Sequence, residues 1–259
     1  MVNRVSKIYN YSSREGARGF GIANSELIAA PMTTLQENRA AVGRLADPDT
    51  VLVTLAQKLP TKWAVLSELS VLAPYFRKRA RVFVPIRDIN LPELVEGESC
   101  SLFKNMLLRQ FRQDPHINID PAVMESWSFR NLRANVRDTM RLLEGAVDFS
   151  KNGGVTLIYV APHKGPGLWH KDGKNRGYLR AVRNLNGLPM EVSLEGDHEH
   201  VPRAQKKNRY RVFSHGVTSI GVHVFPRHPD EGCPLHRTPG NSSSDPRWGY
   251  SVDAVRLEH

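Results

Sequence analysis

The clearest hydrophobic pattern of the chain predicts one long helix. From Phe129 onward, apolar residues recur every three or four positions, which places them in a single stripe along a helix. The pair Asp120-Pro121 is typical of a helix start, because aspartate can cap the free N–H groups and proline fits the first turn. The pair Gly153-Gly154 follows the stripe and favours an end there. We therefore predict a helix that begins near residue 120 and ends near residue 150.

After these glycines the hydrophobic pattern becomes that of strands. Residues 155–160 form a continuous apolar run, as in a buried strand. The pair Asn186-Gly187 lies between two apolar segments, which is the strongest short signal of a β-hairpin. A second hairpin around His215-Gly216 and a last strand are predicted from the segments 209–214, 217–225 and 248–255.

The first half of the chain shows helical patterns instead. Helices are predicted at 33–45, 62–72 and 99–111, and only the segment 80–89 favours a strand. Helices followed by strands are typical of α+β proteins. We predict an α+β fold in which a helical N-terminal half packs on an antiparallel β-rich C-terminal half. The predicted domains are residues 1–150 and 151–256, and residues 257–259 resemble the remnant of a cloning tag.

Charge makes a polyanionic partner the leading hypothesis. Lysine and arginine total 36 against 26 acidic residues, which gives a net charge of +10. The two cysteines lie far apart, which argues against a disulfide framework and favours a reducing compartment. The sequence shows neither an apolar signal segment nor a stretch long enough for a membrane helix. These observations predict a cytoplasmic protein with no membrane partner.

Four arginines form a row on the predicted helix. Their spacings of three and four place them within an arc of about 80°, beside the apolar stripe. The guanidinium group binds phosphate through two hydrogen bonds, so such a row suits a nucleic-acid backbone. A solvated face with salt bridges is the alternative interpretation. The row consists of Arg130, Arg133, Arg137 and Arg141.

A second basic cluster lies in the glycine-rich segment 163–183. Cations alternate there with aromatic residues, and single-stranded nucleic acid needs both, because bases stack on rings while cations bind phosphates. A third basic cluster follows at 203–211 and adds to the same hypothesis. The predicted nucleic-acid-binding residues of these two clusters are Lys164, Trp169, Lys171, Lys174, Arg176, Tyr178, Arg180, Lys206, Lys207 and Arg209.

The histidines support an alternative in which the protein is an enzyme. His163, His170 or His215 could act as general acid or base in RNA cleavage. A metal is the other route to such chemistry. Cys233 and His236 have the C-x2-H spacing that can share a zinc ion, and His223 or His228 could complete the site.

The function favoured by these patterns is binding of RNA or single-stranded nucleic acid, in a ribonucleoprotein or an encapsidating assembly with protein partners. The first alternative is a structure-specific nuclease that uses histidine acid–base or metal-assisted chemistry, with zinc as the candidate cofactor. The second is a protein-interaction module for an acidic partner. Nucleotide hydrolysis is not favoured, because the sequence contains no phosphate-binding loop motif.

Overall fold

The computed structural model describes residues 7–11, 27–29, 35–46, 50–56, 62–76, 81–85, 109, 130–173, 176–187, 190–193 and 221–257. Five residues of the predicted sites lie outside the described parts of the chain, namely Lys174, Lys206, Lys207, Arg209 and His215. The hairpin predicted around His215-Gly216 and the helix predicted at 99–111 also fall on residues that are mostly outside the description.

Helices and strands alternate along the N-terminal part of the chain. The strands are β1 (Lys7–Tyr11), β2 (Leu27–Ala29), β3 (Thr50–Ala56) and β4 (Arg81–Pro85). The helices are α1 (Leu35–Gly43), the 3-10 turn η1 (Arg44–Ala46), α2 (Lys62–Ser70) and α3 (Ala73–Phe76). The helix α7 (Arg130–Leu143) then precedes the C-terminal strands.

The C-terminal part is made almost entirely of strands. They are β5 (Val147–Asp148), β6 (Gly154–Val160), β7 (Tyr178–Asn184), β8 (Glu191–Ser193), β9 (Gly221–Pro226), β10 (Leu235–Arg237) and β11 (Arg247–Arg256), with the 3-10 turn η3 (Pro229–Glu231) before β10. The strands predicted at 155–160 and 248–255 are confirmed as β6 and β11.

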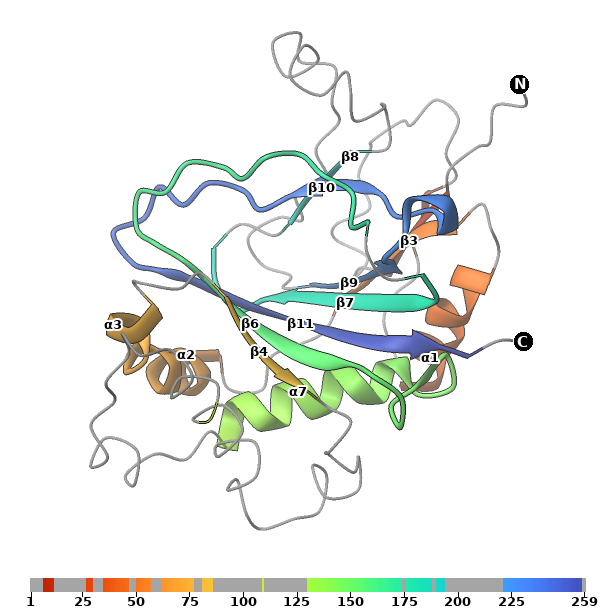
Figure 1. The fold of residues 1–259 in the computed structure, drawn as a ribbon, viewed down its shortest axis with the longest axis horizontal. Coiled ribbons are helices and arrows are strands. Elements are labelled where there is room, and N and C mark those ends of the chain that lie inside the picture. The colour runs from red at the N-terminus through yellow and green to blue at the C-terminus, as the bar shows by residue number, and fades with distance from the viewer. Residues whose placement is uncertain are drawn as a thin grey trace, which may run out of the picture.

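One large sheet organises the molecule (Figure 1). Its strand order is β2-β1-β3-β9-β7-β11-β6-β4, and β5 pairs with β11. Every neighbouring pair from β3 through β9, β7, β11 and β6 to β4 is antiparallel. Strand β1 is parallel to both β2 and β3. A second, smaller sheet consists of β8 and β10.

From β6 onward the chain alternates between the two layers. It leaves β6 in the large sheet and crosses to the small layer, where isolated bridges join Lys164 to Asn241 and His170 to His236. It then returns to the large sheet as β7, crosses to β8, returns as β9, crosses to β10 and returns as β11. This alternation between two facing antiparallel layers is a double-stranded β-helix, a relative of the jelly roll.

Helix α7 covers one face of the large sheet (Figure 1). The apolar stripe predicted for this helix is confirmed from Leu132 to Leu143, because these two residues, Val136 and Met140 are fully buried. The predicted end near residue 150 is wrong, because Gly145 has a positive φ of 88° and Val147 already belongs to β5. Tyr250 of β11 joins the helix to the sheet: its hydroxyl donates to the Asn135 carbonyl oxygen at 2.8 Å and lies 2.7 Å from Thr139 Oγ1. Since side chains alternate along a strand, the other face of β6, β7 and β11 remains for a cavity.

The predicted α+β fold with a separate helical half is wrong. The N-terminal half contributes β1, β2, β3 and β4 to the large sheet, and β4 pairs directly with β6. The described helices are short apart from α7. A short apolar run such as β3 cannot be distinguished from a buried helical segment by its periodicity, so long-range pairing decides its structure.

The hairpin predicted at Asn186-Gly187 is also wrong. Strand β7 pairs with β9 and β11, whereas β8 joins β10 in the other layer. The Asn186 side chain holds this turn against β11, because its Oδ1 accepts from the Trp248 N–H at 2.6 Å and its Nδ2 donates to the Pro246 carbonyl oxygen at 2.9 Å. These contacts lead the chain from one layer to the other.

Among the residues described here, no helix has the length and apolar character needed to cross a membrane.

Candidate metal centre

Three side chains converge between the two layers: His170, Asp172 and His236. One ligand-capable atom of each lies within 4.8 Å of the others. His170 and Asp172 are two positions apart in an extended segment, which places their side chains on the same side. His236 comes from β10, and the bridge between His170 and His236 brings it to the same place. We refer to these three residues as the triad.

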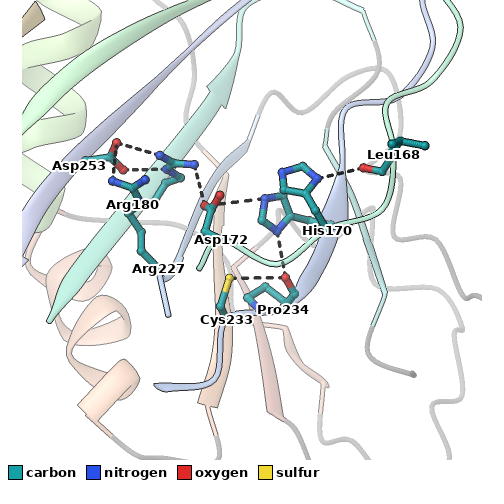
Figure 2. A network of polar contacts seen from close by, with 9 residues as sticks. Leu168, His170, Asp172, Arg180, Arg227, Cys233, Pro234 and Asp253 are labelled. Carbon is teal, nitrogen blue, oxygen red and sulfur yellow. Dashed lines mark hydrogen bonds and ion pairs between the residues drawn. The ribbon is translucent and has the colours of Figure 1, made fainter. Parts of the chain in front are cut away.

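Both imidazole rings of the triad are held by the backbone (Figure 2). The Nδ1 of His170 lies 2.9 Å from the Leu168 carbonyl oxygen, and the Nδ1 of His236 lies 2.9 Å from the Pro234 carbonyl oxygen. A carbonyl oxygen can only accept, so each Nδ1 carries the proton and donates. Each Nε2 therefore keeps a lone pair for a metal, and its ring has a fixed orientation.

The environment of His236 favours its neutral, metal-binding form. Burial lowers the pKa of His236 to about 4, although the nearby Asp172 carboxylate acts in the opposite direction. The Phe225 ring of β9 supports the imidazole, with 5.0 Å between the ring centroids. Metal ligation by histidine requires this deprotonated form.

The third member of the triad is held by an arginine (Figure 2). Arg180 Nη1 donates to Asp172 Oδ2 at 2.6 Å. The other two nitrogens of the same guanidinium donate to Asp253, Nε to Oδ1 at 2.7 Å and Nη2 to Oδ2 at 2.9 Å. Burial alone would lower the pKa of Arg180, but the hydrogen bond and charge of Asp253 raise it above the ordinary value.

Cys233 lies close to the triad as a buried thiol. Its Sγ donates to the Pro234 carbonyl oxygen over 3.7 Å. Burial raises the pKa of Cys233 to about 12. Since a metal binds the thiolate, this environment does not favour Cys233 as a ligand.

A cavity opens beside the triad, on the face of the sheet opposite α7. It holds about 650 Å³ of empty space, part of it open to solvent. Alternate positions of the central strands supply its floor, as the pleat requires. From β6, β7 and β11 these are Thr156, Ile158, Val160, Arg180, Val182, Asn184, Arg247, Gly249 and Ser251.

Arg247 gives this cavity a buried positive charge. Its residue is only 3% exposed. Burial lowers the pKa of Arg247 to about 10, while the charge of Glu191 acts in the opposite direction. Gly249 and Ser251 follow it on the same face of β11 and also line the cavity.

The donor set of the triad fits a divalent transition metal. Two imidazoles and one carboxylate occupy one side of a metal and leave further positions open, which suits catalysis. A structural zinc ion usually takes four protein ligands, several of them cysteines, and the described part of the chain brings together three ligands without a thiolate. The candidate cofactor of this site is therefore a metal ion in an open site.

The residues predicted for zinc are separated in the structure. His236 belongs to the triad, whereas His223 is buried on β9. The His228 Nδ1 accepts from the Asp230 N–H at 3.2 Å and caps the turn η3. Cys233 donates to the backbone, as described above. Within the described residues, these four side chains do not form a cluster of their own.

The predicted acid–base histidines also separate. His170 is in the triad, beside a carboxylate and a second imidazole. His163 is exposed and has a positive φ of 53°, in the segment that crosses between the layers. Sequence reasoning missed Asp172 and Arg247. The available signal for Asp172 was its position two residues after a histidine, with another histidine much farther along the chain.

No protein-family model and no curated protein matches the chain. Solved structures resemble it at low identity. AviO1 from Streptomyces viridochromogenes Tue57 is 14% identical at a TM-score of 0.46, over 86% of this chain and 96% of that one. The rice dioxygenase for auxin oxidation is 11% identical at a TM-score of 0.48, over 97% of this chain and 83% of that one. The non-heme alpha-ketoglutarate-dependent carbocyclase SnoK from nogalamycin biosynthesis is 13% identical at a TM-score of 0.44, over 86% of each chain.

The predicted nucleic-acid-binding function, its RNA partner and the nuclease alternative are wrong. The described histidines proposed for nuclease chemistry do not form a site of their own, because His170 belongs to the triad and His163 is exposed in the crossing segment. The segment 163–183 does not form an open stacking surface, because Trp169 is 6% exposed and lies under the Arg237 guanidinium at 4.6 Å. Arg180 supports Asp172 inside the protein, and Arg176 pairs with Asp230 at 2.6 Å.

The other residues of the predicted nucleic-acid surface lie on α7, in the crossing segment and on β7. Arg130 is the first residue of α7, and Arg133, Arg137 and Arg141 are half-buried along that helix. Arg137 pairs with the adjacent Asp138 at 3.1 Å. In the segment 163–183, Lys164 is exposed, whereas Lys171 and Tyr178 are half-buried.

Proposed function

We propose that the protein is a non-haem Fe(II) oxygenase that uses 2-oxoglutarate as cosubstrate. The observation that carries this proposal is the triad, in which two backbone-oriented imidazoles and one carboxylate converge beside a cavity. A facial set of two histidines and one carboxylate with open positions is characteristic of non-haem Fe(II) oxygenases. The open positions argue against a structural zinc site, which a fourth protein ligand closes. The carbocyclase that resembles this chain is described as non-heme, which makes iron the metal to test.

The cavity supports an anionic cosubstrate. Arg247 presents a guanidinium group from the floor, and a guanidinium binds a carboxylate through two parallel hydrogen bonds. Gly249 and Ser251 follow Arg247 on the same face of β11, and all three residues line the cavity. The carbocyclase that resembles this chain is described as alpha-ketoglutarate dependent, which makes 2-oxoglutarate the cosubstrate to test. Arg247 would bind one of its carboxylates.

The chain's own residues have separate tasks in the proposed reaction. The Nε2 atoms of His170 and His236 and the carboxylate of Asp172 would hold the iron. When bound, Fe(II) supplies the redox chemistry that lets O2 react, which no ordinary side chain provides. Ile158, Val160, Val182 and Met190 make part of the cavity wall apolar and so limit the access of water to the site.

The test is cosubstrate turnover by the full chain. Protein stripped of metal is loaded anaerobically with Fe(II), then given O2 and 2-oxoglutarate, and the release of succinate and CO2 is measured. We expect turnover that requires all three components, even without the main substrate, when ascorbate is added as the two-electron reductant for the second oxygen atom of O2. Loading with Zn(II) should abolish it, because zinc has no redox chemistry. Consumption of 2-oxoglutarate that is equal with and without Fe(II) would contradict the proposal.

A further inference from the structure

A row of three side chains crosses the large sheet beneath the triad. Asp253 of β11 lies opposite Arg180 of β7, and Arg180 lies opposite Phe225 of β9. Residues in register on neighbouring strands present their side chains on the same face, so the row faces the triad as a unit. Phe225 contacts His236, and Arg180 contacts Asp172. Two of the three metal-binding side chains are thus supported from the same row.

The donors of Arg180 are divided between two carboxylates. Asp253 accepts from Nε and Nη2, which fixes the plane of the guanidinium and leaves Nη1 directed at Asp172 (Figure 2). The side chains of Arg180 and Asp172 are 13% exposed and that of Asp253 is 5% exposed. A lysine could not reproduce this arrangement, because its single ammonium group lacks the rigid fork.

The charges of this network cancel. Arg227 approaches Asp253 with 3.4 Å between Nη1 and Oδ2, so two arginines and two aspartates meet. The positive charge of Arg180 by itself opposes the binding of a cation at Asp172. A positioning effect has the opposite sign, since a carboxylate held in place loses less freedom when it binds metal. The direction in which metal affinity changes when the Arg180 charge is removed therefore distinguishes the electrostatic role from the positioning role.

We propose that Arg180, itself oriented by Asp253, is a positioning residue that fixes the Asp172 carboxylate for metal binding. This inference rests on the proposed metal-binding function of the triad. Supporting partners of metal ligands typically contribute about 10–100-fold to metal affinity or activity. Arg180 and Asp253 are expected to act within this range, although neither contributes an atom to the triad.

The test is a titration of the metal-free full chain with Co(II). Binding is monitored through the visible absorption of the bound ion. The variants are Arg180→Lys, which keeps the charge, and Asp253→Asn, which keeps the shape but removes the bidentate acceptor. We expect both to bind Co(II) roughly 10–100-fold more weakly than wild type and to change its absorption spectrum. Arg227→Gln is the matched control, because it removes a charge that contacts Asp253 over a longer distance. Its affinity should stay close to that of wild type.

The outcomes separate the two proposals. If Arg180→Lys and Asp253→Asn bind Co(II) as wild type does, or more tightly, the positioning role is overturned while the metal site stands. If wild type and His236→Ala bind Co(II) equally weakly, the proposed function fails, and the inference fails with it. Circular dichroism checks that each variant is folded. Should Arg180→Lys not fold, Arg180→Gln decides: it removes the opposing positive charge, so weaker Co(II) binding supports the positioning role and tighter binding overturns it.

Discussion

His170 and His236 form a hydrogen-bonded pair across the small layer. Each donates its backbone N–H to the carbonyl oxygen of the other at 2.9 Å, and their ring centroids lie 4.5 Å apart. Two residues that exchange both backbone hydrogen bonds are fixed in register. The spacing of the two imidazoles is therefore set by the backbone, before any metal binds.

Replacing His236 should abolish metal binding at the triad. His236→Ala removes a ligand, so we expect a loss of Fe(II) or Co(II) affinity greater than the roughly 10–100-fold that a supporting partner contributes. The measurement is equilibrium titration of the metal-free protein. His228→Ala is the matched control, because His228 caps the turn η3 and is not in the triad. Equal losses in both variants would contradict the assignment.

Replacing Arg247 should weaken the binding of 2-oxoglutarate. Arg247→Gln removes the buried charge, and hydrogen bonds to charged groups contribute about 1.5–3 kcal/mol, so the KM for 2-oxoglutarate should rise roughly 10–100-fold. Arg247→Lys keeps the charge without the bidentate fork and should have an intermediate effect. Arg176→Gln, an exposed arginine paired with Asp230, is the control. An unchanged KM in Arg247→Gln would exclude this role.

Removing the Tyr250 hydroxyl should destabilise the contact between α7 and the sheet. In Tyr250→Phe, the buried Asn135 carbonyl and the Thr139 hydroxyl both lose this partner, which costs about 1–3 kcal/mol in the free energy of unfolding. Denaturant titration at pH 7 measures the effect. Metal affinity, measured in parallel, should remain that of wild type, because Tyr250 faces α7 and not the cavity.

The same tyrosine should make the fold sensitive to alkali. Burial raises the pKa of Tyr250 above its ordinary value of 10.0. The stability from the neutral phenol is then fully present below pH 10 and is lost as the pH rises through the folded-state pKa, by about 1.4 kcal/mol per pH unit. The free energy of unfolding, measured from pH 9 upward, should therefore fall more steeply with pH for wild type than for Tyr250→Phe. If the free energy of unfolding falls equally with pH in both proteins, ionisation of Tyr250 is not the cause of the alkaline sensitivity.

Gly249 should not tolerate a side chain. A Cβ at this position would lie 2.8 Å from the Arg183 carbonyl oxygen and 3.2 Å from Asn184 Oδ1. Gly249→Ala should therefore cost about 1–3 kcal/mol of stability through overpacking, and it should raise the KM for 2-oxoglutarate by narrowing the cavity. Gly165→Ala, where nothing lies within 4 Å of the added Cβ, should stay within about 0.5 kcal/mol of wild type. Thermal unfolding of both variants provides the comparison.

Local patterns in the sequence determined several elements of this protein. The apolar stripe of α7 and the strands β6 and β11 follow from helical and extended periodicity, because each pattern is complete within one segment. The sequence also drew attention to His170 and His236 as chemically capable residues. It assigned them to different sites, since nothing in their local surroundings relates one to the other.

Only the tertiary structure decided which segments meet. Whether β8 pairs with β7 or with β10, and whether β3 joins the large sheet, depends on hydrogen bonds between distant strands that local periodicity does not encode. The triad has the same origin: closure of the two layers brings β10 against the segment that holds His170 and Asp172. For the basic residues, the sequence showed only that they carry positive charge. Burial against Asp172 and Asp253 made Arg180 part of the candidate metal centre, because the function of a charge depends on the partner that the fold places beside it.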